Sequence, residues 1–145
     1  MVDQKTSAEY QTAIELLYFA YRAFTSKPDR ILEQRSLGRV HHRILYFVGR
    51  NPAIAVNTLL GILKVSKQAL NAPLRQLIEM KLVAVQIAQH DRRVKQLSLT
   101  EEGKQLEAQL TTTQVKHLAE AFTNGGIEAA AGWMKVMEEI ADKDD

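Results

Sequence analysis

A change of hydrophobic period near residue 82 most constrains how this chain of 145 residues can fold. Before this point, apolar residues recur at three- and four-residue spacing, which is typical of helices that pack on one face. Residues 82–87 and 94–99 instead form two short runs typical of strands, joined by a polar connection. We therefore expect helices up to residue 80 and then a β-hairpin.

Two short helices are predicted immediately before the hairpin. Asn57 is expected to cap the first helix, and Ser66 the second, which we expect to run to about Met80. Lys64 and Val65 form the tight turn between them. Two short helices joined by a tight turn make a helix-turn-helix, and a hairpin directly after the second helix is the arrangement of a winged helix.

Two further helices are predicted before this winged lobe. We expect the first to end before Pro28, because the residue ahead of a proline is pushed out of helical geometry. The next is expected to begin at about Ser36, a residue type that caps helices, and to stop at residues 49–52.

After the hairpin, Thr100 can cap a long helix, and two glutamates follow where the positive end of the helix dipole favours carboxylates. A break at residues 124–126 separates this helix from a last one. The predicted fold class is mainly α with a small β-hairpin wing. It is a single domain over 1–145, with a winged helix-turn-helix lobe at 36–99 between helical regions at 1–35 and 100–145.

Charge is distributed unevenly along the chain, although the net charge is only +2. Residues 22–95 contain 14 Lys or Arg and four Asp or Glu, whereas the flanks together contain five Lys and 13 acidic residues. A basic centre between acidic ends suggests a module that binds a polyanion. A solvated basic face would produce the same asymmetry, so charge alone leaves both interpretations open.

Composition and motifs exclude several classes of function. The chain has no cysteine, so it forms no disulfide, thiolate metal site or thiol redox switch. It has no apolar run long enough to span a membrane and begins without the apolar stretch of a signal peptide, so we expect a cytoplasmic protein. No glycine-rich phosphate loop or hydrolase motif is present, and we predict neither enzymatic activity nor a cofactor.

The second helix of the helix-turn-helix carries side chains that can contact DNA bases. A rotation of about 100° per residue places its leucines on one side and its polar residues on the other. Gln and Asn can pair with adenine, and Arg or Lys with guanine. An ordinary amphipathic helix has the same pattern, but the position before a basic hairpin favours binding to double-stranded DNA. The expected contact residues are Ser66, Lys67, Gln68, Asn71 and Arg75.

The tip of the hairpin concentrates three cations, Arg92, Arg93 and Lys95, beside one carboxylate, Asp91. Arginine suits a narrow minor groove with enhanced negative potential. The carboxylate would be unfavourable near phosphates unless it held a guanidinium in a fixed orientation. We therefore expect these four residues to contact DNA or to orient a side chain that does.

Residues 91–106, DRRVKQLSLTEEGKQL, resemble the wing and the following helix of the MarR family of winged-helix transcriptional regulators. Asp91, Arg93, Thr100 and Gly103 match the family's D-x-R and L-T-x-x-G spacing. Residues 56–83 are similar to its helix-turn-helix, and the resemblance covers nearly the whole chain. Three positions depart from the family pattern. Lys64 replaces a turn glycine, Met80-Lys81-Leu82 lacks a glycine, and Pro73 falls within the predicted recognition helix.

The resemblance implies a homodimer that interlocks through its terminal helices, so that 1–35 and 100–145 become dimerisation regions. It also implies a sequence-specific transcriptional regulator, expected to be a repressor, on a pseudo-palindromic operator with half-sites about 10 bp apart. The alternatives are a winged-helix dimer that serves as a protein-interaction module and a ligand sensor with weak DNA binding.

The resemblance further implies a small-molecule effector, because family members often bind anionic or phenolic ligands between the dimerisation helices and the DNA-binding lobes. The same tyrosines at helical spacing would equally serve packing. The expected ligand-lining residues are Tyr18, Tyr21, Arg22, His41 and Arg43.

A metal site is not expected, since the adjacent histidines at 41 and 42 do not share a helix face.

Overall fold

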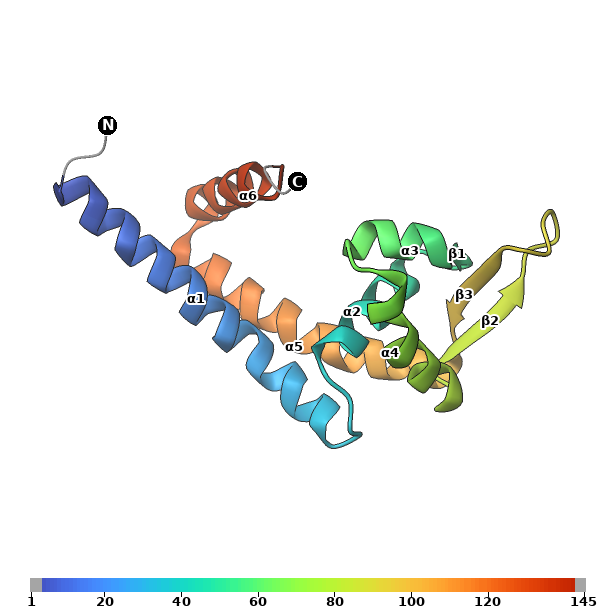
Figure 1. Cartoon of the computed structure of the whole chain (residues 1–145). Coiled ribbons are helices and arrows are strands. Elements are labelled where there is room, and N and C mark those ends of the chain that lie inside the picture. Colours follow the sequence, from blue (N-terminus) through green and yellow to red (C-terminus); the bar gives the residue numbers. More distant parts are fainter. Residues whose placement is uncertain (1–3, 143–145) are drawn as a thin grey trace.

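The computed structural model describes residues 4–142, which form six helices and a small three-stranded sheet (Figure 1). All strand pairs are antiparallel, in the order β1-β3-β2. This architecture confirms the predicted mainly helical fold with a β-hairpin wing. The elements are α1 (Gln4–Glu33), α2 (Arg39–Arg50), β1 (Ile54–Ala55), α3 (Val56–Leu63), α4 (Lys67–Glu79), β2 (Val83–Ile87), β3 (Lys95–Leu99), α5 (Glu101–Gly125) and α6 (Ile127–Asp142).

The hydrophobic core lies under the winged lobe. Leucines 70 and 77 of α4 and Leu97 of β3 are almost wholly buried there, together with Ile44 and Leu45 of α2. Leu32 from α1 and Leu106 and Leu110 from α5 belong to the same cluster. Burial of one such side chain contributes about 2 kcal/mol. Helices α1 and α5 are therefore anchored in the core of the winged lobe.

The prediction that α1 ends before Pro28 is wrong. The helix continues through Pro28 to Glu33. A proline inside a helix costs about 3 kcal/mol, but Pro28 is fully buried, and Leu32 one turn later has no exposed surface. Packing of this segment against the core offsets the lost backbone hydrogen bond.

The predicted caps of α2 and α3 are also wrong. Ser36 has a left-handed backbone (φ 59°) and lies in the turn that closes α1, where the N–H of Leu37 donates to the Leu32 carbonyl (2.9 Å). Gly38 is the N-cap of α2 instead. Helix α3 begins at residue 56 after Ala55, one residue before the expected cap.

The elements that build the wing lie where the sequence predicts them. Ser66 caps α4 and Thr100 caps α5, each accepting a hydrogen bond from a backbone N–H three residues later (3.0 Å). Strands β2 and β3 lie within the two predicted runs. The addition is β1, whose Ile54 pairs with Leu97 of β3 and so widens the hairpin into a sheet.

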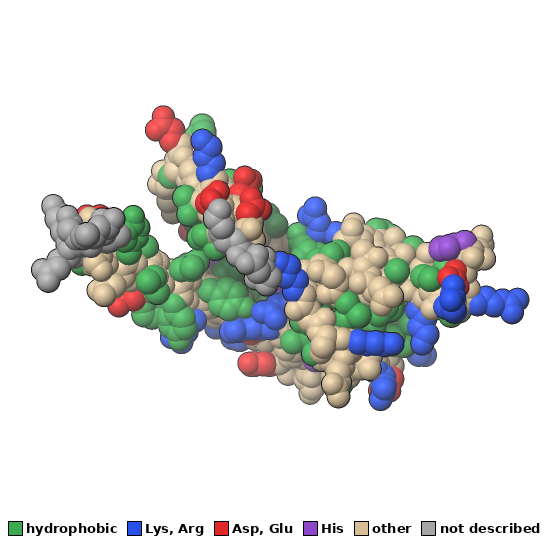
Figure 2. Space-filling view, turned by 45° about the horizontal axis from the view of Figure 1, so that its top comes forward, with side chains coloured by type: hydrophobic (Ala, Val, Ile, Leu, Met, Phe, Trp, Pro, Cys, Tyr) green, Lys and Arg blue, Asp and Glu red, His purple; other side chains and the backbone are tan. Residues whose placement is uncertain are grey.

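Helices α1, α5 and α6, here called the frame, extend away from the lobe (Figure 1). Figure 2 shows Lys and Arg spread over the lobe and acidic side chains gathered on α6. No helix within residues 4–142 is long and apolar enough to cross a membrane. Many large apolar side chains of the frame are nonetheless exposed: Tyr10, Ile14, Leu16, Leu17, Tyr18, Phe19 and Tyr21 on α1, Val115 on α5, and Ile127, Trp133, Met134, Val136 and Ile140 on α6.

Candidate nucleic-acid interface

Helix α4 separates its apolar and polar residues by face. Leucines 70, 74 and 77 are buried and fix the helix on the core. The polar residues Ser66, Lys67, Gln68, Asn71 and Arg75 are all exposed and form what we call the polar arc. The structure thus presents to solvent the five residues that the sequence assigns to DNA contact.

The unusual residues in this motif leave its geometry intact. Lys64 adopts the left-handed conformation (φ 54°, ψ 43°) that a glycine would take at this turn. Pro73 lies inside α4 without ending the helix. Arg75 therefore stays on the same helix as Lys67 and Asn71. These three residues are spaced four apart, so they share the face of α4 beside the wing.

The wing tip contains a carboxylate that holds an arginine. Asp91 accepts a bidentate pair from Arg93: Nε donates to Oδ1 (3.1 Å) and Nη2 to Oδ2 (3.2 Å). The backbone N–H of Arg93 also donates to Oδ1 (2.9 Å). These hydrogen bonds, the side-chain ones first, lower the pKa of Asp91. The Arg93 side chain is 91% exposed, so the carboxylate orients a guanidinium that faces solvent.

A hollow of about 470 Å³, here called the interface hollow, separates α4 from the wing. Its apolar lining includes Leu74, Val85 and Leu97. Cations from two elements line it as well, Lys67 and Arg75 from α4 and Arg93 and Lys95 from the wing. A concave surface with apolar and cationic parts suits a sugar–phosphate backbone, because its deoxyriboses present C–H groups and its phosphates are anionic. Asn57 also lines the hollow, and the sequence assigned it to a cap rather than to this site.

The L-T-x-x-G motif joins the wing to the frame. The Thr100 hydroxyl donates to the Lys81 carbonyl (2.6 Å), and the Thr100 N–H donates to the Leu82 carbonyl (3.1 Å). Gly103 follows on the first turn of α5, where a Cβ would overlap the Leu82 carbonyl. This motif therefore allows the first turn of α5 to contact the backbone of Lys81 and Leu82, just before β2.

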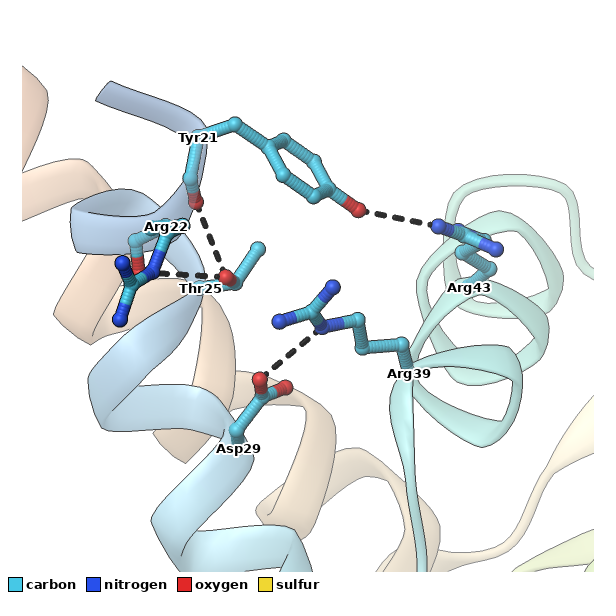
Figure 3. Close-up of polar contacts among 6 residues, drawn as sticks. All are labelled: Tyr21, Arg22, Thr25, Asp29, Arg39 and Arg43. Atoms are coloured by element: carbon cyan, nitrogen blue, oxygen red, sulfur yellow. Dashed lines mark hydrogen bonds and ion pairs between the residues drawn. The ribbon is translucent and has the colours of Figure 1, made fainter. Parts of the chain in front are cut away.

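A second cavity, about 360 Å³ and here called the frame cavity, lies between the frame and α2. The Tyr21 hydroxyl accepts a hydrogen bond from Arg43 (3.1 Å), and Arg39 forms an ion pair with Asp29 (3.0 Å) (Figure 3). His42 also lines this cavity, and its burial lowers its pKa against an opposite effect of the Asp29 carboxylate. The cavity thus combines aromatic walls with two arginines.

Two of the five expected ligand residues, Tyr21 and Arg43, line the frame cavity. Tyr18 and Arg22 do not, and Arg22 lies over the Tyr18 ring instead, 5.8 Å from its centroid. His41 faces α4. The sequence missed Asp29, Arg39 and His42 as lining residues, although the spacing of residues 39, 42, 43 and 46 places them on one helical face.

The described residues contain no cluster of three or more His, Asp or Glu side chains arranged to hold a metal ion. A polar arc on a recognition helix, next to a wing that presents an oriented arginine, defines a winged helix-turn-helix DNA-binding protein.

Comparison with known proteins identifies the family. The MarR family profile matches residues 36–94. The chain is 42% identical over 137 residues to the HTH-type transcriptional regulator PetP of Rhodobacter capsulatus, an alignment that covers 94% of this chain and 82% of PetP. The chain belongs to the MarR family of transcriptional regulators.

Solved structures share the fold at low sequence identity. Streptococcus pneumoniae FabT in complex with DNA superposes with a TM-score of 0.79, at 18% identity, over 93% of this chain and 99% of FabT. NadR in complex with 4-hydroxyphenylacetate gives a TM-score of 0.73, at 21% identity, over 88% of this chain and 91% of NadR. These likenesses confirm the fold, with its recognition helix and wing.

Proposed function

We propose that the protein is a cytoplasmic, homodimeric repressor that binds a pseudo-palindromic operator in a sequence-specific manner. The observation that carries this proposal is that Lys67, Asn71 and Arg75 of the polar arc line the same hollow as Arg93, which Asp91 holds. In a complex of this kind α4 enters the major groove, where Asn71 and Arg75 can contact base edges. Arg93 then enters the adjacent minor groove, and the backbone between the two grooves crosses the hollow.

The exposed apolar surface of the frame supports the homodimer. Leu17 and Phe19 of α1 and Met134 of α6 are each about half exposed, and a soluble monomer rarely leaves so many large apolar side chains uncovered. Leu17→Glu should therefore yield monomers in analytical ultracentrifugation. Ile62→Glu is the matched control, because Ile62 is also exposed (41%) but lies on α3. Equal sedimentation of both variants would contradict a dimer built from the frame.

The test of DNA recognition is selection of bound sequences from a random duplex pool with the full-length protein. We expect an inverted repeat with half-sites about one helical turn, or about 10 bp, apart. The selected site, placed over a promoter in a reporter strain, should lower expression when the protein is present. If no sequence is enriched, the protein-interaction module is favoured. If expression of the reporter rises, the protein is an activator rather than a repressor.

The frame cavity supports an effector site within this proposal. An arginine beside a tyrosine hydroxyl suits the carboxylate and phenol of a small aromatic acid, and NadR was solved with 4-hydroxyphenylacetate. Titration calorimetry with 4-hydroxyphenylacetate should give binding that Arg43→Ala abolishes. Arg30→Ala, an exposed arginine elsewhere on the frame, is the control. Identical heats from both variants would place any binding outside this cavity.

A further inference from the structure

His41 does not line the frame cavity but bonds to the recognition helix. Its Nε2 lies 2.9 Å from Oε1 of Gln76 on α4, and its Nδ1 accepts a hydrogen bond from the Gly38 N–H (2.9 Å). The Gln76 amide in turn donates to the Ser36 carbonyl (3.3 Å). These contacts join the connection after α1, the start of α2 and the last turn of α4.

The hydrogen-bond pattern requires one protonation state of His41. Because the Gly38 N–H donates to Nδ1, that nitrogen must be unprotonated, and the single ring proton lies on Nε2. Nε2 then donates to Oε1 of Gln76, which leaves the Gln76 amide to donate to Ser36. A second proton, on Nδ1, would face the N–H of Gly38 and break this network, here called the His41 network.

The His41 network acts at the position that controls how α4 presents its polar arc. Gln76 lies between Arg75, which faces the interface hollow, and Leu77, which is fully buried. Leu77 fixes the depth of the helix, and apolar contacts alone tolerate small rotations because they are not directional. A hydrogen bond is directional. The bond to Gln76 therefore limits rotation of α4 about its own axis, the motion that would displace Arg75 from a base edge.

We propose that His41 and Gln76 are positioning residues for DNA recognition, which hold α4 in register with the end of α1 and release it when His41 is protonated. This proposal rests on the proposed DNA-binding function. It also gives the frame a direct connection to the recognition helix, since Ser36 lies in the turn that closes α1.

The network depends on the protonation of His41 itself, because Nδ1 can accept from the Gly38 N–H only while it carries no proton. Histidine is the side chain that ordinarily changes charge between about pH 5 and pH 8. Within residues 4–142 the three hydrogen-bonding partners of the network are uncharged groups. Nearby on α2, Arg39 pairs with Asp29. The other charged or titratable residues on the adjoining segments are Glu33 and Arg35 at the α1 end, His42 and Arg43 on α2, and Arg75 and Glu79 on α4.

The experiment measures affinity of the full-length protein for the selected duplex and for a scrambled duplex of equal length, at pH 8.0 and pH 5.5. His41→Ala removes both ring bonds. His41→Gln keeps an amide whose oxygen can accept from the Gly38 N–H, as Gln does in a capping box, and whose N–H can donate to Gln76. It does not titrate. His117→Gln is the matched control, because His117 is exposed on α5 outside the network.

At pH 8.0 we expect His41→Ala to bind the selected duplex about tenfold more weakly, the size of one or two lost hydrogen bonds. Its affinity for the scrambled duplex should change less than about twofold, since nonspecific binding depends on the total of the phosphate contacts, including those of the wing, rather than on the alignment of one side chain with a base edge. His41→Gln should bind the selected duplex within about threefold of wild type. On going to pH 5.5, wild type and His117→Gln should lose about tenfold more specific affinity than His41→Gln.

Parallel pH profiles of wild type and His41→Gln would overturn the proposal, even if His41→Ala failed to fold. Equal losses by His41→Ala on both duplexes would reduce His41 to a structural residue. Failure of the DNA-binding function itself has a different signature, because wild type would then bind the two duplexes equally at pH 8.0.

Discussion

Gly103→Ala tests the junction between the wing and the frame. A methyl group on Gly103 would overlap the carbonyl oxygen of Leu82 and lie 2.9 Å from its carbonyl carbon. Ordinary carbon–carbon contacts are about 3.5–4.0 Å, so α5 and the start of β2 must separate by about 1 Å. Neither partner is a flexible side-chain end, because both are backbone. The separation would stretch the two hydrogen bonds from Thr100 to the Lys81 and Leu82 carbonyls.

The expected loss of stability follows from three contributions. Two weakened hydrogen bonds cost about 1 kcal/mol each, and overpacking of a tight contact costs about 1–3 kcal/mol. Alanine regains about 1 kcal/mol of helix propensity over glycine. The net effect is a destabilisation of about 2–4 kcal/mol, which corresponds to a fall in Tm of about 5–15 °C for a domain of this size.

Urea and thermal unfolding followed by circular dichroism would measure this loss at a fixed protomer concentration, because unfolding of an oligomer depends on concentration. Gly61→Ala is the matched control, since Gly61 lies in α3 and a Cβ there meets nothing within 4 Å. It should raise stability by about 0.5–1 kcal/mol. If Gly103→Ala were as stable as Gly61→Ala, the steric explanation of the glycine in the motif would be refuted.

Four further variants test other parts of the structure. Arg93→Ala should reduce the slope of log K against log[salt] by about one, and an unchanged slope in DNA titrations would remove the wing from the complex. Asp91→Asn should weaken specific binding equally at pH 5 and pH 8. The hydrogen bonds from Arg93 lower the pKa of Asp91, so the carboxylate stays ionised throughout this range and would lose its charge only as the pH fell through that lowered pKa. Asn71→Ala should cost about 1–3 kcal/mol at one base pair and relax preference there in a repeated selection, whereas uniform weakening would mark a phosphate contact. Lys81→Gly should raise the free energy of unfolding by about 0.5–1 kcal/mol in urea, because Lys81 has a left-handed backbone (φ 60°), and no gain would mean that its side chain stabilises the turn.

The parts of the fold that local chemistry specifies could be predicted from the sequence. Ser66 and Thr100 cap their helices, as a hydroxyl followed by helix-forming residues predicts. The two wing strands are predicted by the change of hydrophobic period near residue 82. Pro28, by contrast, lies inside α1, because its burial in the core outweighs the local cost of a helical proline.

The candidate site was predictable to a similar extent. The polar arc follows from helix periodicity once Ser66 is the cap, and its five residues are exposed as that periodicity requires. The contact between Asp91 and Arg93 follows from their proximity in sequence. His41 was assigned to the ligand site, and only the packing of α2 on α4 placed it beside Gln76, 35 residues away. No local pattern encodes a contact between side chains so far apart in the chain.

The sequence by itself determined the helix-turn-helix, the wing and the basic surface that they share, because each depends on caps, periodicity and charges within about ten residues. The tertiary structure alone decided which polar groups meet across elements. It paired Asp29 with Arg39, brought Tyr21 to Arg43 and enclosed the frame cavity between α1, α2 and α5. The physical reason is that hydrophobic burial sets how helices pack but is not directional, so the partners of polar side chains are fixed only once the core is assembled.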